Sequence, residues 1–131
     1  MRTTILLAIL VLLSCSDVWL FNPIDDGTYA GTFTITLENG LTKTGNVTFT
    51  FKGRTYSCVP DKQYLPPGGA GEFLTFGRTI RIKDTALHTA EFDWTLILNG
   101  DFEFTFDGSR LVLQQNDTKH HRFRVIDLIR R

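Results

Sequence analysis

Apolar and polar residues alternate along most of the chain after Gly27, and a period of two is typical of β-strands that bury one face. Residues 28–37 and 41–51 both follow this pattern and are joined by a turn at 38–40. They predict a hairpin, with Gly45 as a bulge in its second strand. The apolar face of this hairpin consists of Tyr29, Phe33, Ile35, Leu37, Leu41, Val47, Phe49 and Phe51.

Two further hairpins follow from the same alternation. A two-residue turn at Lys52–Gly53 predicts that Phe49 faces Tyr56 and keeps the apolar face continuous. Residues 72–83 predict a hairpin that turns at Gly77–Arg78, with Phe73 and Thr75 facing Ile80 and Ile82. One long strand is the alternative for this segment, but it would point Arg78 inward, and burying an unpaired charge is unfavourable.

The strongest alternation runs from Phe92 to Leu113. A three-residue loop at 98–100 predicts a hairpin in which Leu96 faces Phe102 and Trp94 faces Phe104. A two-residue turn at Asp107–Gly108 then pairs Phe104 with Leu111.

The last strand, within residues 122–130, has its apolar positions out of phase. Phe123 and Val125 are predicted to face inward, followed by Ile126 and Leu128. This change of phase predicts a β-bulge near Val125.

These segments give eight or nine antiparallel strands, joined mostly by tight hairpins, with no amphipathic helix of useful length. Short, evenly spaced strands form either a sandwich or an up-and-down barrel. Because consecutive strands are hairpin neighbours and closure removes exposed edges, we predict an all-β, antiparallel up-and-down β-barrel over residues 27–131.

The first residues depart from this alternation. Arg2 precedes an unbroken apolar run at 5–13 and a Ser14–Cys15 pair, which together are typical of a secretory signal. The run is shorter than the roughly 20 residues that span a bilayer. The segment looks like the lipobox of bacterial lipoproteins, in which the cysteine becomes the lipidated new N-terminus. An ordinary signal peptide with a coincidental cysteine and an inner-membrane anchor are the alternatives.

The lipobox resemblance implies three parts: a signal peptide at 1–14, a lipidated tether at 15–26 and the barrel at 27–131. Lipid on Cys15 would make the membrane a partner of the protein. In lipoproteins of this kind, a serine after the cysteine, here Ser16, implies the outer membrane. The periplasmic side and the cell surface both remain open.

The chain also resembles the small bacterial lipocalin-like lipoproteins. The similar segments are 27–31 (GTYAG), 89–94 (TAEFDW) with 98–100 (LNG), Asp107–Gly108 followed by Leu111, and the closing strand at 123–130. The resemblance implies an envelope-anchored, lipocalin-like barrel, in a family most of whose members have no assigned activity.

The balance of charged residues and the positions of the histidines and carboxylates argue against several classes of function. Arg2 is the only charged residue before position 15, so the remaining chain has 13 basic and 14 acidic side chains. This balance argues against nucleic-acid binding. His120 and His121 point to opposite faces of a regular strand, and no spacing predicts a metal site. Asp93 and Glu103 should face outward, so we predict no enzyme activity and no cofactor.

Cys58 is left as a single thiol if Cys15 carries lipid. Its place on an apolar strand face predicts a small, buried, structural residue and not a reactive one.

The barrel interior holds the remaining candidate site. Nine aromatic residues point inward by phase and either fill an eight-stranded barrel or line a small-ligand pocket. The candidate ligand-binding residues are Tyr56, whose hydroxyl needs a partner, with Trp94 and Phe104. We favour a non-enzymatic envelope interaction module that binds a protein or glycan through loops such as 64–71 or through its outer face. The alternative is a carrier or sensor of a small apolar ligand inside the barrel.

Overall fold

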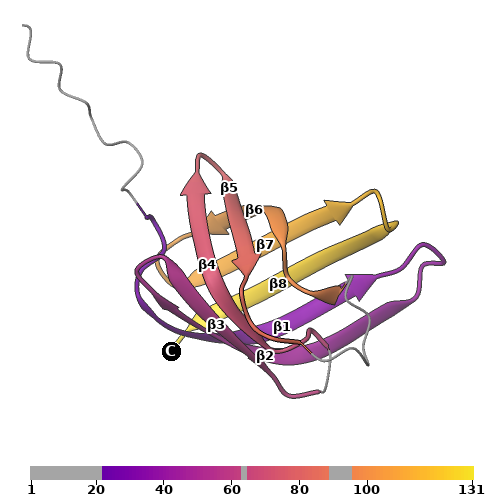
Figure 1. The fold of residues 1–131 in the computed structure, drawn as a ribbon, viewed down its shortest axis with the longest axis horizontal. Helices are drawn as coiled ribbons and strands as arrows, with labels where there is room; N and C mark the ends of the chain where they lie inside the picture. Colours follow the sequence, from indigo (N-terminus) through magenta and orange to yellow (C-terminus); the bar gives the residue numbers. More distant parts are fainter. Residues whose placement is uncertain (1–21, 63–64, 89–95) are drawn as a thin grey trace, which may run out of the picture.

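The alternating segments form eight β-strands in a computed structural model, which describes residues 22–62, 65–88 and 96–131. Each strand is antiparallel to the next, and the last pairs with the first, so the sheet closes (Figure 1). The strands are β1 (Gly27–Thr36), β2 (Thr42–Lys52), β3 (Thr55–Pro60), β4 (Gly69–Phe76), β5 (Thr79–Asp84), β6 (Gly100–Phe106), β7 (Arg110–Asp117) and β8 (Arg122–Arg130). The predicted all-β, up-and-down barrel is confirmed.

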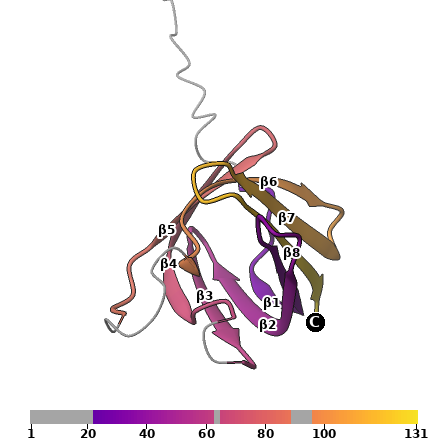
Figure 2. The same cartoon turned by 90° about the vertical axis from the view of Figure 1, so that its right-hand side faces the viewer.

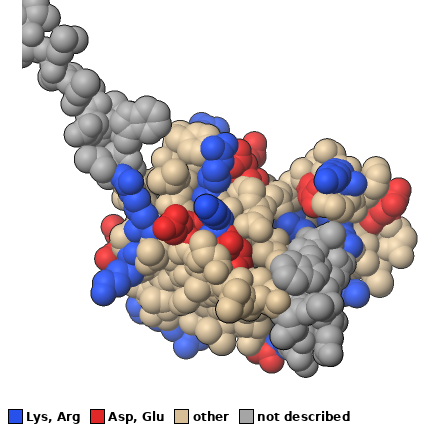
Figure 3. Space-filling model, in the orientation of Figure 1, with Lys and Arg blue, Asp and Glu red and all other residues tan. Residues whose placement is uncertain are grey.

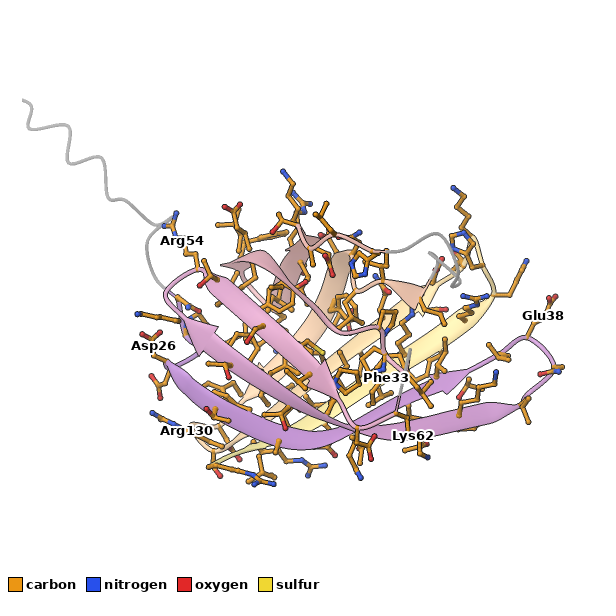
Figure 4. All side chains as sticks on the ribbon, turned by 60° about the horizontal axis from the view of Figure 1, so that its bottom comes forward. Asp26, Phe33, Glu38, Arg54, Lys62 and Arg130 are labelled. Atoms are coloured by element: carbon orange, nitrogen blue, oxygen red, sulfur yellow. The ribbon has the colours of Figure 1, made fainter. Side chains whose placement is uncertain are left out.

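The strands follow one another around the barrel in chain order (Figure 2). The connections β2–β3, β4–β5 and β6–β7 are short and lie at one end, which we call the hairpin end. The strand ends that lead into the connections at 37–41, 61–68, 85–99 and 118–121 lie at the other, the loop end. Figure 4 shows Asp26, Arg54 and Arg130 at the hairpin end and Glu38 at the tip of the loop end. No helix among the described residues is long and apolar enough to cross a membrane.

Aromatic side chains fill the interior toward the hairpin end. The Phe51 ring lies 5.4 Å from Tyr29 and 5.3 Å from Phe73, both edge-on, which is a favoured geometry for aromatic pairs. Tyr29, Phe33 and Phe49 have no exposed surface. Ile24 is also buried, although it precedes the first strand in the expected tether. This half of the barrel is a packed core.

Residues 22–26 are attached to the hairpin end by polar contacts. The Asn22 side chain donates a hydrogen bond to the Gly53 carbonyl (2.9 Å), and the Gly53 amide donates to Asp26 Oδ1 (2.8 Å). Arg130 Nη1 lies 3.0 Å from Asp25 Oδ2, and the Tyr29 hydroxyl donates to the Asp25 carbonyl. The segment before β1 therefore enters the barrel at the hairpin end.

Two predicted hairpins are confirmed. The β4–β5 pair turns at Gly77–Arg78, with Phe73 opposite Ile82 and Thr75 opposite Ile80. The β1–β2 pair turns at 38–40, with Gly40 at φ 79°. The predicted bulge at Gly45 is wrong, because Gly45 pairs regularly with Phe33. A Cβ at Gly45 would overlap the Leu65 carbonyl, so the glycine allows the β3–β4 connection to approach.

Two predicted registers are wrong by two residues. Phe49 pairs with Cys58 and not with Tyr56, because the β2–β3 turn is Gly53–Arg54, with Gly53 at φ 58°. Phe104 pairs with Leu113 and not with Leu111. A shift by two preserves which side chains face inward, so the apolar pattern is the same in both registers.

The predicted hairpin between residues 92–98 and 100–106 is also wrong. One side of β6 pairs with β5, with Phe102 opposite Ile80, and the other side pairs with β7. Both edges of β6 are therefore occupied, and the predicted pairing of Leu96 with Phe102 cannot form. Residues 89–95, including Trp94, lie outside the described residues.

Candidate functional site

The interior toward the loop end contains polar side chains, in contrast to the aromatic half. The main one is Arg124 on β8, of which 2% is exposed. The predicted bulge at Val125 is wrong, because Val125 pairs regularly with Gln114 and Thr34. Arg124 therefore shares the inward phase of Ile126, while Phe123, which was expected inside, is exposed.

Arg124 is held by neighbouring side chains of β7. Its Nη1 donates to Gln115 Oε1 over 2.7 Å, and its Nη2 lies 3.8 Å from Asp117 Oδ2. Gln115 Nε2 in turn donates to the Asn99 carbonyl over 3.0 Å, just before β6. A buried charge is tolerated when it is hydrogen-bonded and paired, and these contacts supply both.

Asp117 continues this network to the rim of the barrel. Its Oδ2 lies 2.8 Å from His120 Nδ1, and the His120 amide donates to its Oδ1. Burial alone raises the pKa of Asp117, but the hydrogen bonds from His120 and the charge of Arg124 outweigh it, so the pKa is lowered. The carboxylate is therefore ionised at neutral pH and balances the buried cation.

A second polar group lies across β3, β4 and β5. Tyr56, Gly71 and Asp84 form one cross-strand row, in which Gly71 has no side chain. Asp84 Oδ1 lies 3.0 Å from His88 Nε2 and accepts a hydrogen bond from the Ala86 amide. The side chains of Asp84 and His88 are almost completely buried at the loop end, where β5 passes into the β5–β6 connection.

Tyr56 is a candidate residue because its hydroxyl needs a hydrogen-bond partner. Only 4% of it is exposed, and its buried hydroxyl has no hydrogen-bond partner in the described part of the chain. Burial raises the pKa of Tyr56, and the nearby charge of Asp84 adds to this effect, so the phenol stays protonated. A buried donor of this kind is usually hydrogen-bonded, and a water molecule or a ligand atom could accept its hydrogen.

Cys58 follows Tyr56 on the inward face of β3. Burial raises the pKa of the Cys58 thiol to about 12. The thiolate is the nucleophilic form, so this thiol is unsuited to nucleophilic chemistry at neutral pH. The described residues also contain no group of three or more His, Cys, Asp or Glu side chains placed to hold a metal ion.

The structure places the other predicted site residues as follows. Phe104 is an inward residue of β6 with 9% exposed, and it belongs to the hydrophobic core. The ring next to Tyr56 is Phe49, with centroids 6.1 Å apart, and Phe104 makes no ring contact with Tyr56. Trp94 and Cys15 lie outside the described residues. Sequence reasoning missed Arg124, Gln115 and Asp84, which alternation alone does not mark as polar interior positions.

An outer groove of about 520 Å³ crosses β1, β2 and β3. The described residues that line it include Ala30, Asn46, Thr48 and Arg131 but no aromatic ring. Small-molecule sites are usually enclosed and largely apolar, so this open groove is a weaker candidate than the interior.

Comparisons with known proteins do not assign the chain to a family. No family model, no curated protein and no solved structure matches the chain. A closed, antiparallel barrel of eight strands is compatible with a lipocalin-like fold.

Proposed function

We propose that the protein is a non-enzymatic module of the bacterial cell envelope, anchored to the outer membrane by lipid on Cys15, which binds a protein or glycan at its loop end. The observation that carries this proposal is the position of residues 22–26. They are bound to the hairpin end by Asn22 and Asp26, so an anchor at Cys15 would hold that end toward the membrane. The loop end would then face away from the bilayer.

The two longest connections of the chain begin and end at strand ends on this outward side. Long loops on a rigid scaffold often carry binding residues. Leu87 is fully exposed on the β5–β6 connection, and Leu41 on the β1–β2 turn is half exposed. Burial of an exposed leucine against a partner stabilises a complex by roughly 1.5–3 kcal/mol. These side chains are candidates for contact with a protein partner.

The packed aromatic half argues against a large apolar ligand in the barrel. The rings of Phe49 and Phe51 are stacked 5.7 Å apart, and neither is exposed by more than 2%. A ligand in this half would have to displace side chains from a close-packed core, which is unfavourable.

Site-specific crosslinking in the native bacterium tests the proposed function. A photoreactive residue at position 87 would lie at the loop end, and one at position 109 at the hairpin end, where Ser109 is also exposed. We expect a discrete crosslinked partner from position 87 that is lost in Leu41→Ser or Phe123→Ser protein. The same product from both positions, or none from position 87, would contradict the proposed binding at the loop end. The lipid on Cys15 is tested separately, by the intact mass of the purified protein.

A carrier or sensor of a small ligand is the second candidate, and the hydroxyl of Tyr56 favours it. This group is buried, has no hydrogen-bond partner among the described residues and lies on the residue that pairs with Gly71. Native mass spectrometry of the protein purified without detergent tests this candidate. A small-molecule adduct that is released on unfolding and lost in Tyr56→Phe protein would support a carrier, whereas a bare mass would support the interaction module.

A further inference from the structure

The hairpin end has a repeated feature that the proposed function does not use. Each of its three turns contains a glycine with positive φ followed closely by an arginine: Gly53–Arg54, Gly77–Arg78 and Gly108–Ser109–Arg110. The three arginines are exposed. In a tight hairpin the turn residues project beyond the strands, so Arg54 and Arg78 extend from the same end of the barrel, whereas Arg110 is the first residue of β7 and bonds to Asp127 on β8. The basic residues at this end are Lys52, Arg54, Arg78, Arg110, Arg130 and Arg131.

The acidic residues at this end are largely engaged in local contacts. Asp25 pairs with Arg130, and Asp26 accepts the Gly53 amide. Asp107 accepts hydrogen bonds from the amides of Ser109 and Arg110 within its own turn. Among the described residues, the side chain of Arg78 has no such carboxylate partner. Arg110 is paired with Asp127 and Arg130 with Asp25, so Arg54 and Arg78 are the turn arginines that supply positive charge at this end. Acidic and basic side chains are interspersed over the face shown in Figure 3.

The β4–β5 hairpin adds exposed apolar groups beside Arg78. It projects from the barrel in Figure 1, and Leu74 and Phe76 on its outer face are each 49% exposed. The guanidinium of Arg81 lies 5.1 Å from the centre of the Phe76 ring and is paired with Asp101, so it packs against the ring but adds no net charge. Apolar side chains bordered by arginine suit the headgroup region of a bilayer, where apolar and charged groups are both accommodated.

We propose that the hairpin end docks on a membrane surface that contains anionic phospholipid, with Arg54 and Arg78 contacting phosphate groups. Guanidinium groups form paired hydrogen bonds with phosphate, and each basic residue near an anionic leaflet strengthens binding about fivefold. The inference rests on the proposed lipid anchor. Cys15 precedes Asn22 by seven residues, which span at most about 25 Å, so the anchor would keep the hairpin end close to the bilayer.

The docking also gives the barrel an orientation. A lipid anchor alone keeps the hairpin end toward the bilayer but leaves the domain free to tilt about its tether, whereas contacts at two turns restrict this tilting. The loop end and Leu87 would then be held away from the lipid, where a partner can reach them.

The test uses the lipidated protein reconstituted in vesicles of phosphatidylcholine, with or without phosphatidylglycerol. A fluorescent label is attached to Ser109→Cys at the hairpin end or to Lys119→Cys at the loop end, and a nitroxide on the lipid headgroup quenches nearby label. Cys58 is buried and stays unlabelled in the folded protein. We expect stronger quenching at position 109 than at 119, and only in vesicles that contain phosphatidylglycerol.

Charge variants distinguish docking from simple tethering. In Arg54→Gln/Arg78→Gln protein we expect the docked fraction to fall about fivefold for each arginine removed. Lys43→Gln/Lys83→Gln, which removes two exposed charges near the loop end, is the matched control and should leave quenching unchanged. Equal quenching at both positions, or identical behaviour of the two double variants, would overturn the proposal.

Failure of the proposed lipid anchor can be distinguished from failure of the proposed docking. If the intact mass shows no acyl chains, the proposed anchoring is wrong, and the same protein is then sedimented with both kinds of vesicle. If docking occurs without the anchor, vesicles with phosphatidylglycerol should retain the wild-type protein, and they should not retain the Arg54→Gln/Arg78→Gln protein. Absence of retention in this assay would overturn the docking as well.

Discussion

Arg124 on β8 and Gln115 on β7 face each other inside the barrel, and Nη1 of Arg124 donates a hydrogen bond to Oε1 of Gln115 over 2.7 Å. Below this pair toward the hairpin end, the next inward residues of the two strands are Ile126 and Leu113, which are completely buried. The pair therefore marks the change from an apolar to a polar interior. One barrel therefore contains an apolar, packed half and a half in which polar side chains are buried.

Truncation of Arg124 should destabilise the fold. Arg124→Ala removes a buried guanidinium, which leaves Gln115 Oε1 without its donor and Asp117 without its nearby positive charge, and the loss of such a partner costs about 2–4 kcal/mol. Urea unfolding followed by fluorescence measures the free energy of unfolding. Arg81→Ala, which breaks an exposed pair with Asp101, is the control and should have a much smaller effect. Equal losses in both variants would contradict the role assigned to Arg124.

The two buried tyrosines should respond differently to loss of their hydroxyl groups. Tyr29→Phe removes a hydrogen bond to the Asp25 carbonyl and should cost about 1 kcal/mol. Tyr56→Phe removes a hydroxyl with no protein partner in the described residues and should leave the free energy of unfolding unchanged or raise it. Urea unfolding of both variants tests this. A loss at Tyr56 as large as at Tyr29 would show that its hydroxyl is satisfied in solution.

Cys58 should be unreactive while the protein is folded. Because burial raises the pKa of its thiol to about 12, almost no thiolate is present at pH 8, and the sulfur is also inaccessible. A colorimetric thiol reagent should therefore report Cys58 only after guanidinium is added. Rapid reaction of Cys58 in the native protein would contradict the burial described above.

Strand faces could be predicted from the sequence, but registers only in part. Strict alternation placed Phe49, Phe51 and Phe73 in the core, and all three are buried. Alternation repeats every two residues, so it cannot distinguish registers that differ by two. The β6–β7 register depends on Asp107, whose carboxylate accepts the amides of Ser109 and Arg110 and lengthens the turn.

The pairing of strands that are distant in the sequence also could not be predicted from the pattern of apolar residues. The segment before Asn99 alternates well enough to predict a strand, yet β6 pairs with β5, which lies before the long connection. Of the candidate site, Tyr56 could be predicted as a buried hydroxyl. Arg124 could not, because an inward arginine is favourable only when Gln115 and Asp117 face it across the β7–β8 pair.

The ion pair between Arg110 and Asp127 should make part of the stability depend on acid pH. Two hydrogen bonds of 2.9 and 2.6 Å join these side chains across β7 and β8. The bonds from Arg110 lower the pKa of Asp127 below its value in the unfolded chain. A lowered pKa in the folded state means that the unfolded state binds the proton more readily at acid pH.

The pair therefore contributes fully above the unfolded pKa of about 3.9, and its contribution is lost as the pH falls through the lower folded pKa. Urea midpoints of the wild type and Asp127→Asn protein, measured from neutral to acid pH, should differ most at neutral pH and converge in acid. Arg110→Gln should reproduce this convergence, because it removes the other half of the same pair. A difference that stays constant with pH would mean that Asp127 acts through packing and not through its charge.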